Sequence, residues 1–183
     1  MEKSRNEINK LKPKMETKVL VRASFYAAIS IILTRFLSPM IGESIRIGFG
    51  PIPIMLSGIF YGPIIGGLVG FVADIVGVLI NPMGPSIHPG FTFSSILTGA
   101  IPGVMYLIFL KNKGKKTDAK LPIIISMVLI TVIVNILLNT LWLSQMFGNP
   151  FMAQLVIRMP KIIVQFIMET VLMLFLYKPL SKV

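Results

Sequence analysis

The residues of this chain that could do chemistry are few, and several of them interrupt apolar sequence. Between residues 42 and 103 the chain is nearly all apolar, Gly or Pro, and four ionisable side chains stand out: Glu43, Arg46, Asp74 and His88. A lone charge in hydrocarbon costs roughly 2.5–3.5 kcal/mol on insertion scales. A chain that keeps Asp74 in an apolar run is therefore expected to use it. We interpret this stretch as one side of a buried binding pocket.

Polar and aromatic residues near the ends of the other apolar segments could complete this pocket. Asn135 and Asn139 are four residues apart and share a helix face, with Trp142 close to it. Cations would favour an anionic ligand, and flat rings would stack on an aromatic one. The candidate ligand-contacting residues are Arg46, Phe49, Asp74, His88, Phe91, Asn139, Trp142, Arg158 and Lys161.

Each of these candidates has a purely structural alternative. Arg158 and Lys161 could anchor a helix at the membrane interface by extending their charged ends towards water. Asn135 could join two helices through hydrogen bonds. Asp74 and Glu169 could pair with cations inside the bundle. The residue types alone leave both readings open.

Catalysis is poorly supported by the residue types. The chain has no Cys, which excludes thiolate nucleophiles, disulfides and Cys-ligated metals. Its single His, His88, excludes a His cluster for a metal and could simply be exposed in its Pro-rich loop. No nucleophile stands beside a plausible base, and no phosphate-binding P-loop is present. We therefore expect a protein that is not an enzyme and that needs no metal and no cofactor.

The composition indicates an integral membrane protein with one membrane domain. The chain has 183 residues, of which 54% are hydrophobic and 14% charged. A soluble domain of this length could not bury so much apolar surface. The net charge of +11 could suggest a nucleic-acid partner, but the cations stand in short blocks beside apolar segments. That pattern is typical of membrane topology, so we expect a lipid bilayer and no nucleic acid.

We expect an all-α integral membrane fold with six transmembrane helices and both termini in the cytoplasm. Residues 1–18 form a basic cytoplasmic segment, and residues 19–183 form the membrane domain. Basic blocks at the N-terminus, at 111–120 and at the tail belong on the cytoplasmic side, so an even number of crossings must separate them. The expected spans are 19–38, 51–61, 63–80, 91–110, 121–143 and 158–177. The expected outer loops are 39–50, which alternates like an extended chain, 81–90 and 144–157.

Small residues mark close helix contacts. Ala23 and Ala27 are four residues apart in the first expected span, so they lie on one helix face. Small residues let another helix approach closely. The partner could be a helix of this same chain or another protein that docks on this face.

These features resemble the substrate-binding S components of energy-coupling-factor (ECF) transporters, which import vitamins in prokaryotes. The resemblance covers roughly residues 18–180. It includes the expected spans, the Ala23/Ala27 pair and the outer loop before a short second span. The runs IRIGFGPIPIMLSGIFYGPIIGGLVGFVADIVG (45–77) and HPGFTFSSILTGAIPG (88–103) look most like the folate-specific members.

The resemblance implies a function and an assembly. Such a protein binds its vitamin, here folate, in an outward-facing pocket of the cell membrane. It then docks on a transmembrane coupling protein driven by two ATPase subunits, with Ala23 and Ala27 in contact with the coupling protein.

The resemblance also suggests which residues bind which part of the ligand. Asp74 or an Asn would bind the pterin edge. Trp142, Phe49 and Phe91 would stack on the rings, and Arg46, Arg158 or Lys161 would bind the carboxylates. Two alternatives stay open: an S component for a different vitamin, and a membrane subunit without a transport role.

Overall fold

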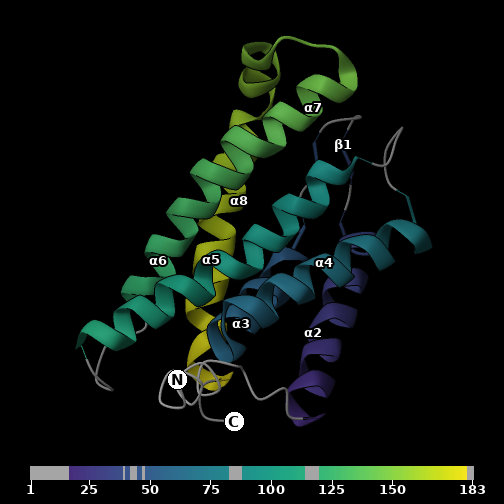
Figure 1. The fold of residues 1–183 in the computed structure, drawn as a ribbon. Coiled ribbons are helices and arrows are strands. Elements are labelled where there is room, and N and C mark those ends of the chain that lie inside the picture. The colour runs from purple at the N-terminus through teal and green to yellow at the C-terminus, as the bar shows by residue number, and fades with distance from the viewer. Residues whose placement is uncertain are drawn as a thin grey trace, which may run out of the picture.

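The computed structural model describes residues 17–38, 40–41, 45–46, 48–82, 88–113 and 120–180, and these residues form a bundle of helices (Figure 1). Two short strands, Met40–Ile41 (β1) and Ile45–Arg46 (β2), pair antiparallel. The alternation predicted extended chain in this loop but not the pairing. The helices are α2 (Thr17–Arg35), α3 (Pro51–Tyr61), α4 (Pro63–Ile80), α5 (Pro89–Lys113), α6 (Lys120–Leu129), η2 (Ile130–Leu138), α7 (Asn139–Phe147) and α8 (Phe151–Leu180).

The expected all-α membrane fold is confirmed. Five helices of the described chain are long and apolar enough to cross a membrane, and α6, η2 and α7 together form one of them, Lys120–Phe147. The shorter apolar helix α3 has 11 residues, so it rises only about 16 Å. Five long helices and α3 occupy the positions of the six expected spans. The basic segment expected at 1–18 lies outside the described residues except for its last two.

The connection expected at 144–157 is wrong. Helix α7 continues to Phe147 and α8 already begins at Phe151, so only residues 148–150 separate them. Gly148 takes a left-handed conformation with φ of 68°, which ends α7. The backbone N–H of Gln154 donates to the Pro150 carbonyl oxygen, which starts α8. The expected span at 158–177 is therefore the middle of a 30-residue helix.

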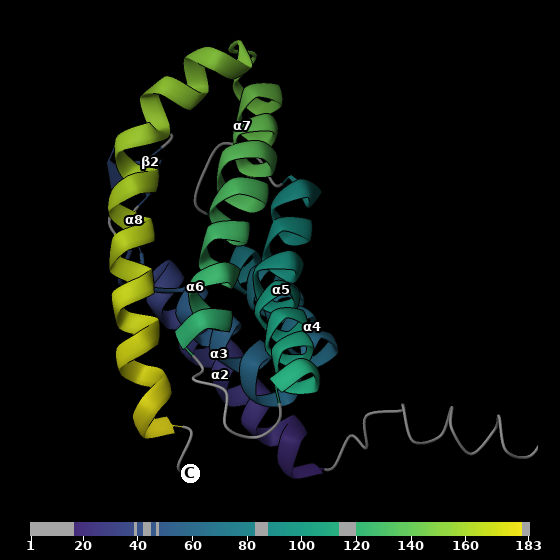
Figure 2. The ribbon, with the colours of Figure 1, turned by 90° about the vertical axis from the view of Figure 1, so that its left-hand side faces the viewer.

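The two ends of the bundle differ in what they contain (Figures 1 and 2). The start of α2, the ends of α5 and α8 and the start of α6 lie at the lower end. The strands and the turn between α7 and α8 lie at the upper end. The chain segments next to the basic blocks therefore share one end, which is the arrangement that an even number of crossings gives.

Glycines allow α3, α4 and α5 to pack backbone against backbone. A Cβ atom on Gly66 would collide with the Gly99 carbonyl oxygen, and one on Gly99 would collide with that of Gly66. Gly58 of α3 meets the same Gly99 carbonyl. Small residues at such positions are what membrane helices use for close contact. This tight unit fixes one side of the bundle.

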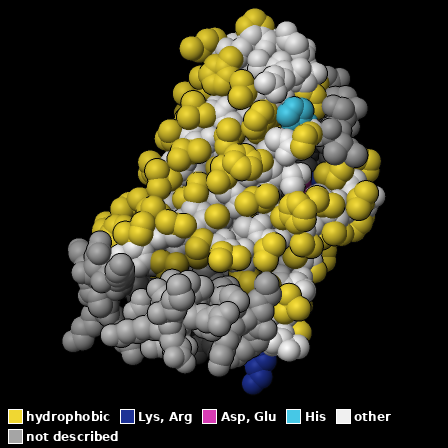
Figure 3. All heavy atoms as spheres, in the orientation of Figure 1, with side chains coloured by type: hydrophobic (Ala, Val, Ile, Leu, Met, Phe, Trp, Pro, Cys, Tyr) yellow, Lys and Arg dark blue, Asp and Glu magenta, His cyan; other side chains and the backbone are white. Residues whose placement is uncertain are grey.

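Apolar side chains cover the outside of the bundle. Large hydrophobic residues are exposed on every long helix, including Phe25, Leu79, Leu107, Leu137 and Phe175. The space-filling view shows them spread over the whole visible side of the described chain (Figure 3). A surface of this kind fits hydrocarbon and would be unstable in water.

Neighbouring glycines of α4 give a test of this packing. Gly66→Ala should lower the stability of the protein by about 1–3 kcal/mol, because its Cβ meets the rigid backbone of Gly58 and Gly99. Gly67→Ala is the matched control, because the nearest atom to its Cβ is a side-chain methyl group of Ile96 at 3.3 Å. It should change stability by less than about 1 kcal/mol. Thermal unfolding in detergent measures both, and equal melting temperatures would contradict the packing argument.

Candidate ligand-binding site

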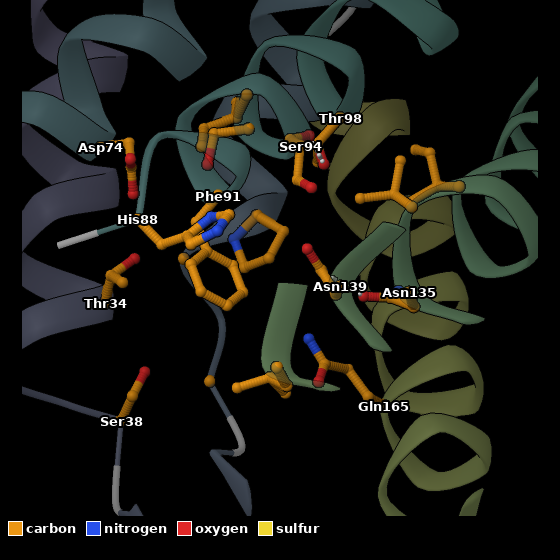
Figure 4. A pocket seen from close by; sticks show the side chains of 18 of the residues that line it. Thr34, Ser38, Asp74, His88, Phe91, Ser94, Thr98, Asn135, Asn139 and Gln165 are labelled. Carbon is orange, nitrogen blue, oxygen red and sulfur yellow. Dashed lines mark hydrogen bonds between the residues drawn. The ribbon is translucent and has the colours of Figure 1, made fainter. Parts of the chain in front are cut away.

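A cavity of about 300 Å³ lies in the upper half of the bundle, between α2, the start of α3, α4, α5, η2, α7 and α8 (Figure 4). It is at the lower end of the range that small-molecule sites occupy. The loop before α3 forms part of its wall through Gly48 and Gly50, and the first turns of α3 add Pro51 and Ile54. Because α3 begins only at Pro51, the space above its first turn is left for the cavity.

Helix α8 contributes a stripe of polar side chains to the cavity: Arg158, Lys161, Gln165 and Glu169. Their spacing of three, four and four residues keeps them on one helix face. The stripe is about 16 Å long at 1.5 Å per residue. Arg158, Gln165 and Glu169 are buried, with 3%, 7% and 2% of their surface exposed. The cations stand at the end of the stripe nearer the α7–α8 turn, which we call its outer end, and the carboxylate stands at the opposite, inner end.

The inner end of the stripe is held by a hydrogen bond. The Gln165 side-chain amide donates to Glu169 Oε1 over 2.7 Å. The carbonyl oxygen Oε1 of Gln165 is buried and has no hydrogen-bond partner in the described chain. It therefore offers an acceptor to whatever fills the cavity.

The α6–η2–α7 helix faces this stripe with two amides. Asn139 donates from Nδ2 to Asn135 Oδ1 over 3.3 Å, and both side chains line the cavity. Asn139 Oδ1 is buried without a partner among the described residues, as is Arg158 Nε. A buried polar atom left unpaired costs roughly 1–3 kcal/mol. The cavity therefore favours a ligand that carries both hydrogen-bond donors and an anion.

Asp74 is engaged by the protein itself. Its Oδ1 lies 3.6 Å from Arg35 Nη2, and its Oδ2 accepts a 2.7 Å hydrogen bond from Thr92. Arg35 also donates to the Asn81 carbonyl oxygen, and Asn81 Nδ2 donates back to the Arg35 carbonyl oxygen. The ionic alternative considered for Asp74 is thus present and joins α2, α4 and α5. Asp74 still lines the cavity.

An aromatic group forms part of the cavity wall. His88 and Phe91 line it, and their rings meet edge to face at 5.9 Å between centroids. Trp142 lies behind them, with its ring centroid 5.3 Å from that of His88. Its indole N–H donates to Ser94, another wall residue. Trp142 therefore borders the site through its neighbours.

Three of the predicted residues, Phe49, Ala23 and Ala27, lie outside the cavity wall. Phe49 is 39% exposed and lines a second, apolar groove between α2, α3, α5 and α8. The side chain of Arg46 lies outside the described residues. Ala23 and Ala27 are buried against Ile54, Ile65, Val69 and Ala73 of α3 and α4, so they make the contact within the chain that the sequence left open.

The sequence analysis missed several wall residues. Thr34, Arg35, Ser38, Ser95, Thr98 and Gln165 line the cavity but were not among the candidates. Asn135 and Glu169, for which the sequence left a structural role open, line it as well. The spacing of Gln165 and Glu169 from Arg158 was the available signal. The hydroxyl residues gave none, because such side chains are also common in helix contacts.

Comparisons with known proteins identify the family. Residues 18–177 match the family described as the substrate-specific component of the ECF transporter. The chain is 33% identical over 164 residues, 90% of each chain, to the folate transporter FolT of Clostridium novyi (strain NT). The chain belongs to the family of ECF transporter S components. As a member of a transport family it binds and carries a substrate rather than converting one.

Other relatives agree with this assignment. The folate transporter FolT of Leuconostoc mesenteroides is 26% identical over 137 residues, 74% of this chain and 68% of that protein. A crystal structure of FolT bound with folic acid superposes with a TM-score of 0.76 at 32% identity, over 90% of this chain and 97% of that one. A solved S component of a bacterial ECF transporter has the same fold, with a TM-score of 0.68 at 23% identity over 91% and 96%.

The Arg35–Asp74 pair of this S component can be tested by removing one charge. Asp74→Asn should lower stability by about 3 kcal/mol, because it leaves the buried Arg35 guanidinium without its ion partner. The double variant Arg35→Met, Asp74→Asn is the control and should recover part of this loss, because no unpaired charge remains. Thermal unfolding of the ligand-free protein in detergent measures both effects. A double variant no more stable than Asp74→Asn would contradict a direct pairing.

Proposed function

We propose that this S component binds folate with high affinity in the cavity and delivers it for uptake into the cell. The observation that carries the proposal is the similarity over 90% of the chain to a FolT structure bound with folic acid. The chemistry of the cavity supports it independently. Folate carries a donor-rich pterin at one end, a benzoyl ring in the middle and two carboxylates at the other end, and the cavity has partners for each.

The α8 stripe suggests how the ligand lies. Arg158 and Lys161 at its outer end bind the carboxylates, because charge-assisted hydrogen bonds to carboxylates are the strongest that side chains make. The unpaired oxygens of Gln165 and Asn139 accept from the N–H groups of the pterin. His88 and Phe91 stack on the rings, with Trp142 behind them. Asp74 contributes mainly by holding the wall, since Arg35 and Thr92 already engage both of its oxygens.

Transport requires an energy source that this chain does not carry, because its sequence has no P-loop. We therefore propose that it docks on an ECF transmembrane coupling protein with two ATPase subunits, in the cell membrane of a prokaryote. Both termini and the 111–120 loop face the cytoplasm, and the cavity opens outward. Because Ala23 and Ala27 are buried in the chain itself, the exposed residues next to them on α2 would make the contact.

Folate binding can be followed through Trp142, the single Trp of the chain. Folate added to the detergent-purified protein should quench its fluorescence saturably at nanomolar concentration, because Trp142 touches the wall residues His88 and Ser94. Thiamin and riboflavin should neither quench saturably nor compete. Competition by another vitamin would assign a different substrate. No saturable quenching and no heat of binding with folate would reject the proposal.

Two buried glutamines of α8 provide a matched test of pterin recognition. Gln165 and Gln154 both carry a buried Oε1 that has no partner among the described residues, but of the two only Gln165 lines the cavity. Gln165→Met should weaken folate binding about 10-fold or more, because it removes the oxygen that accepts a hydrogen bond from the pterin. Gln154→Met should leave the affinity within about twofold of the original. Equal affinities for the two variants, measured by calorimetry, would show that Gln165 does not contact the ligand.

A further inference from the structure

The π-helix η2 lies in the wall of the cavity. It covers nine residues, Ile130–Leu138, within the longer α6–η2–α7 helix. π-Helices are rare and are frequently found at functional sites. Ile130, Val134 and Asn135 of η2 line the cavity. The irregular stretch and the candidate site therefore coincide, which raises the question of what the irregularity provides.

The π-helix changes where backbone groups find their partners. The backbone N–H of Asn139 donates to the carbonyl oxygen of Val134, five residues back. In an α-helix that N–H would donate to Asn135. The Asn135 carbonyl oxygen instead accepts from two side chains, from Thr140 Oγ1 over 3.3 Å and from Arg158 Nη1 over 3.3 Å. The wider turn thus offers α8 a backbone acceptor.

Thr140 completes this anchor for Arg158. Its side chain is fully buried, with 0% of its surface exposed, and it is absent from the cavity wall. Thr140 Oγ1 accepts from Arg158 Nη1 over 2.8 Å, the shorter of the two bonds to the guanidinium. Because the hydroxyl proton points to the Asn135 carbonyl, the lone pairs of Oγ1 are left for Arg158.

The anchor uses one nitrogen of the guanidinium. Both hydrogen bonds of Arg158 within the described chain start from Nη1, and Nε is buried without a partner there. Arg158 itself lines the cavity. The edge formed by Nε and Nη2 is therefore available, and two parallel N–H groups on one edge match the two oxygens of a carboxylate.

We propose that Thr140 is a positioning residue: together with the Asn135 carbonyl it holds Nη1 of Arg158, so that the Nε–Nη2 edge receives a carboxylate of the ligand. The inference rests on the proposed function, because it takes folate as the ligand. It assigns a role in affinity and selectivity to a residue that does not contact the ligand. Without Thr140, the guanidinium keeps only the longer bond to Asn135 and can turn away from the carboxylate.

Selectivity between charged and neutral ligands tests this role. The experiment compares folate with its diamide, in which both carboxylates are neutral amides, by Trp142 fluorescence and calorimetry. Thr140→Val removes the hydroxyl at nearly constant shape and should weaken folate binding about 10-fold or more, while diamide binding changes less than about twofold. Thr140→Ser retains the hydroxyl and should keep the original selectivity. In an Arg158→Gln background, Thr140→Val should have no further effect on folate binding.

Matched variants separate positioning from general damage. Thr170→Val removes a hydroxyl of the same helix bundle that bonds to the Phe166 carbonyl, and it should leave both affinities unchanged. If Thr140→Val does not fold, Thr140→Cys is used in its place. The thiol of this variant accepts hydrogen bonds only weakly, so the variant should prefer folate over the diamide less than the original protein does.

Three results would overturn the inference. One is folate affinity unchanged in the folded Thr140→Val or Thr140→Cys variant. Another is an equal loss for folate and its diamide, which a purely structural role predicts. The third is the absence of folate binding by the unsubstituted protein, which rejects the proposed function as well.

Discussion

An eleven-residue helix rises only about half the thickness of the hydrocarbon core, and α3 occupies the centre of this bundle. Residues 52–59 of α3 are all buried, in contact with α2, α4, α5 and α8. The strands and the loop through Gly48 and Gly50 come before α3 in the chain, and this loop forms part of the cavity wall. A loop at membrane depth is stable only where protein or a cavity covers it. The short helix leaves space that the cavity occupies, and the long helices around it supply polar side chains to the cavity wall.

The polar groups of this cavity fall into two kinds according to their partners. Arg35, Asp74 and Thr92 satisfy one another and join three helices, so their main effect is on the shape of the wall. Arg158, Asn139 and Gln165 each keep a buried atom without a partner in the described chain. Unpaired groups of this kind reduce stability in the empty protein. The free energy that these unpaired groups cost is recovered when a ligand with hydrogen-bond donors and an anionic group enters. A ligand without such groups does not recover it, so the same side chains determine both affinity and selectivity.

Residue patterns predicted the helices better than the site. Apolar runs bounded by Gly and Pro placed α3 and α4 at the residues where the structure has them, because these breakers act locally. The start of α8 was missed, because Gly148, Asn149 and Pro150 suggested a long connection, whereas the turn takes only residues 148–150 and α8 begins at Phe151. The η2 irregularity was equally invisible, because the sequence of that segment is apolar like its neighbours. Asp74 was recognised as important, but its pairing with Arg35 depends on the packing of α2 against α4.

Tight binding in such a cavity creates a problem of release. A ligand that forms hydrogen bonds with Arg158, Asn139 and Gln165 can leave only if all three bonds break together or if the three side chains move apart. Arg158 and Gln165 stand on α8, whereas Asn139 and the Arg158 anchor at Thr140 stand on the α6–η2–α7 helix. A small displacement between these two helices would break the anchor and weaken the ligand contacts in the same step. On the proposed function, a partner that displaces either helix would weaken ligand binding without contacting the ligand.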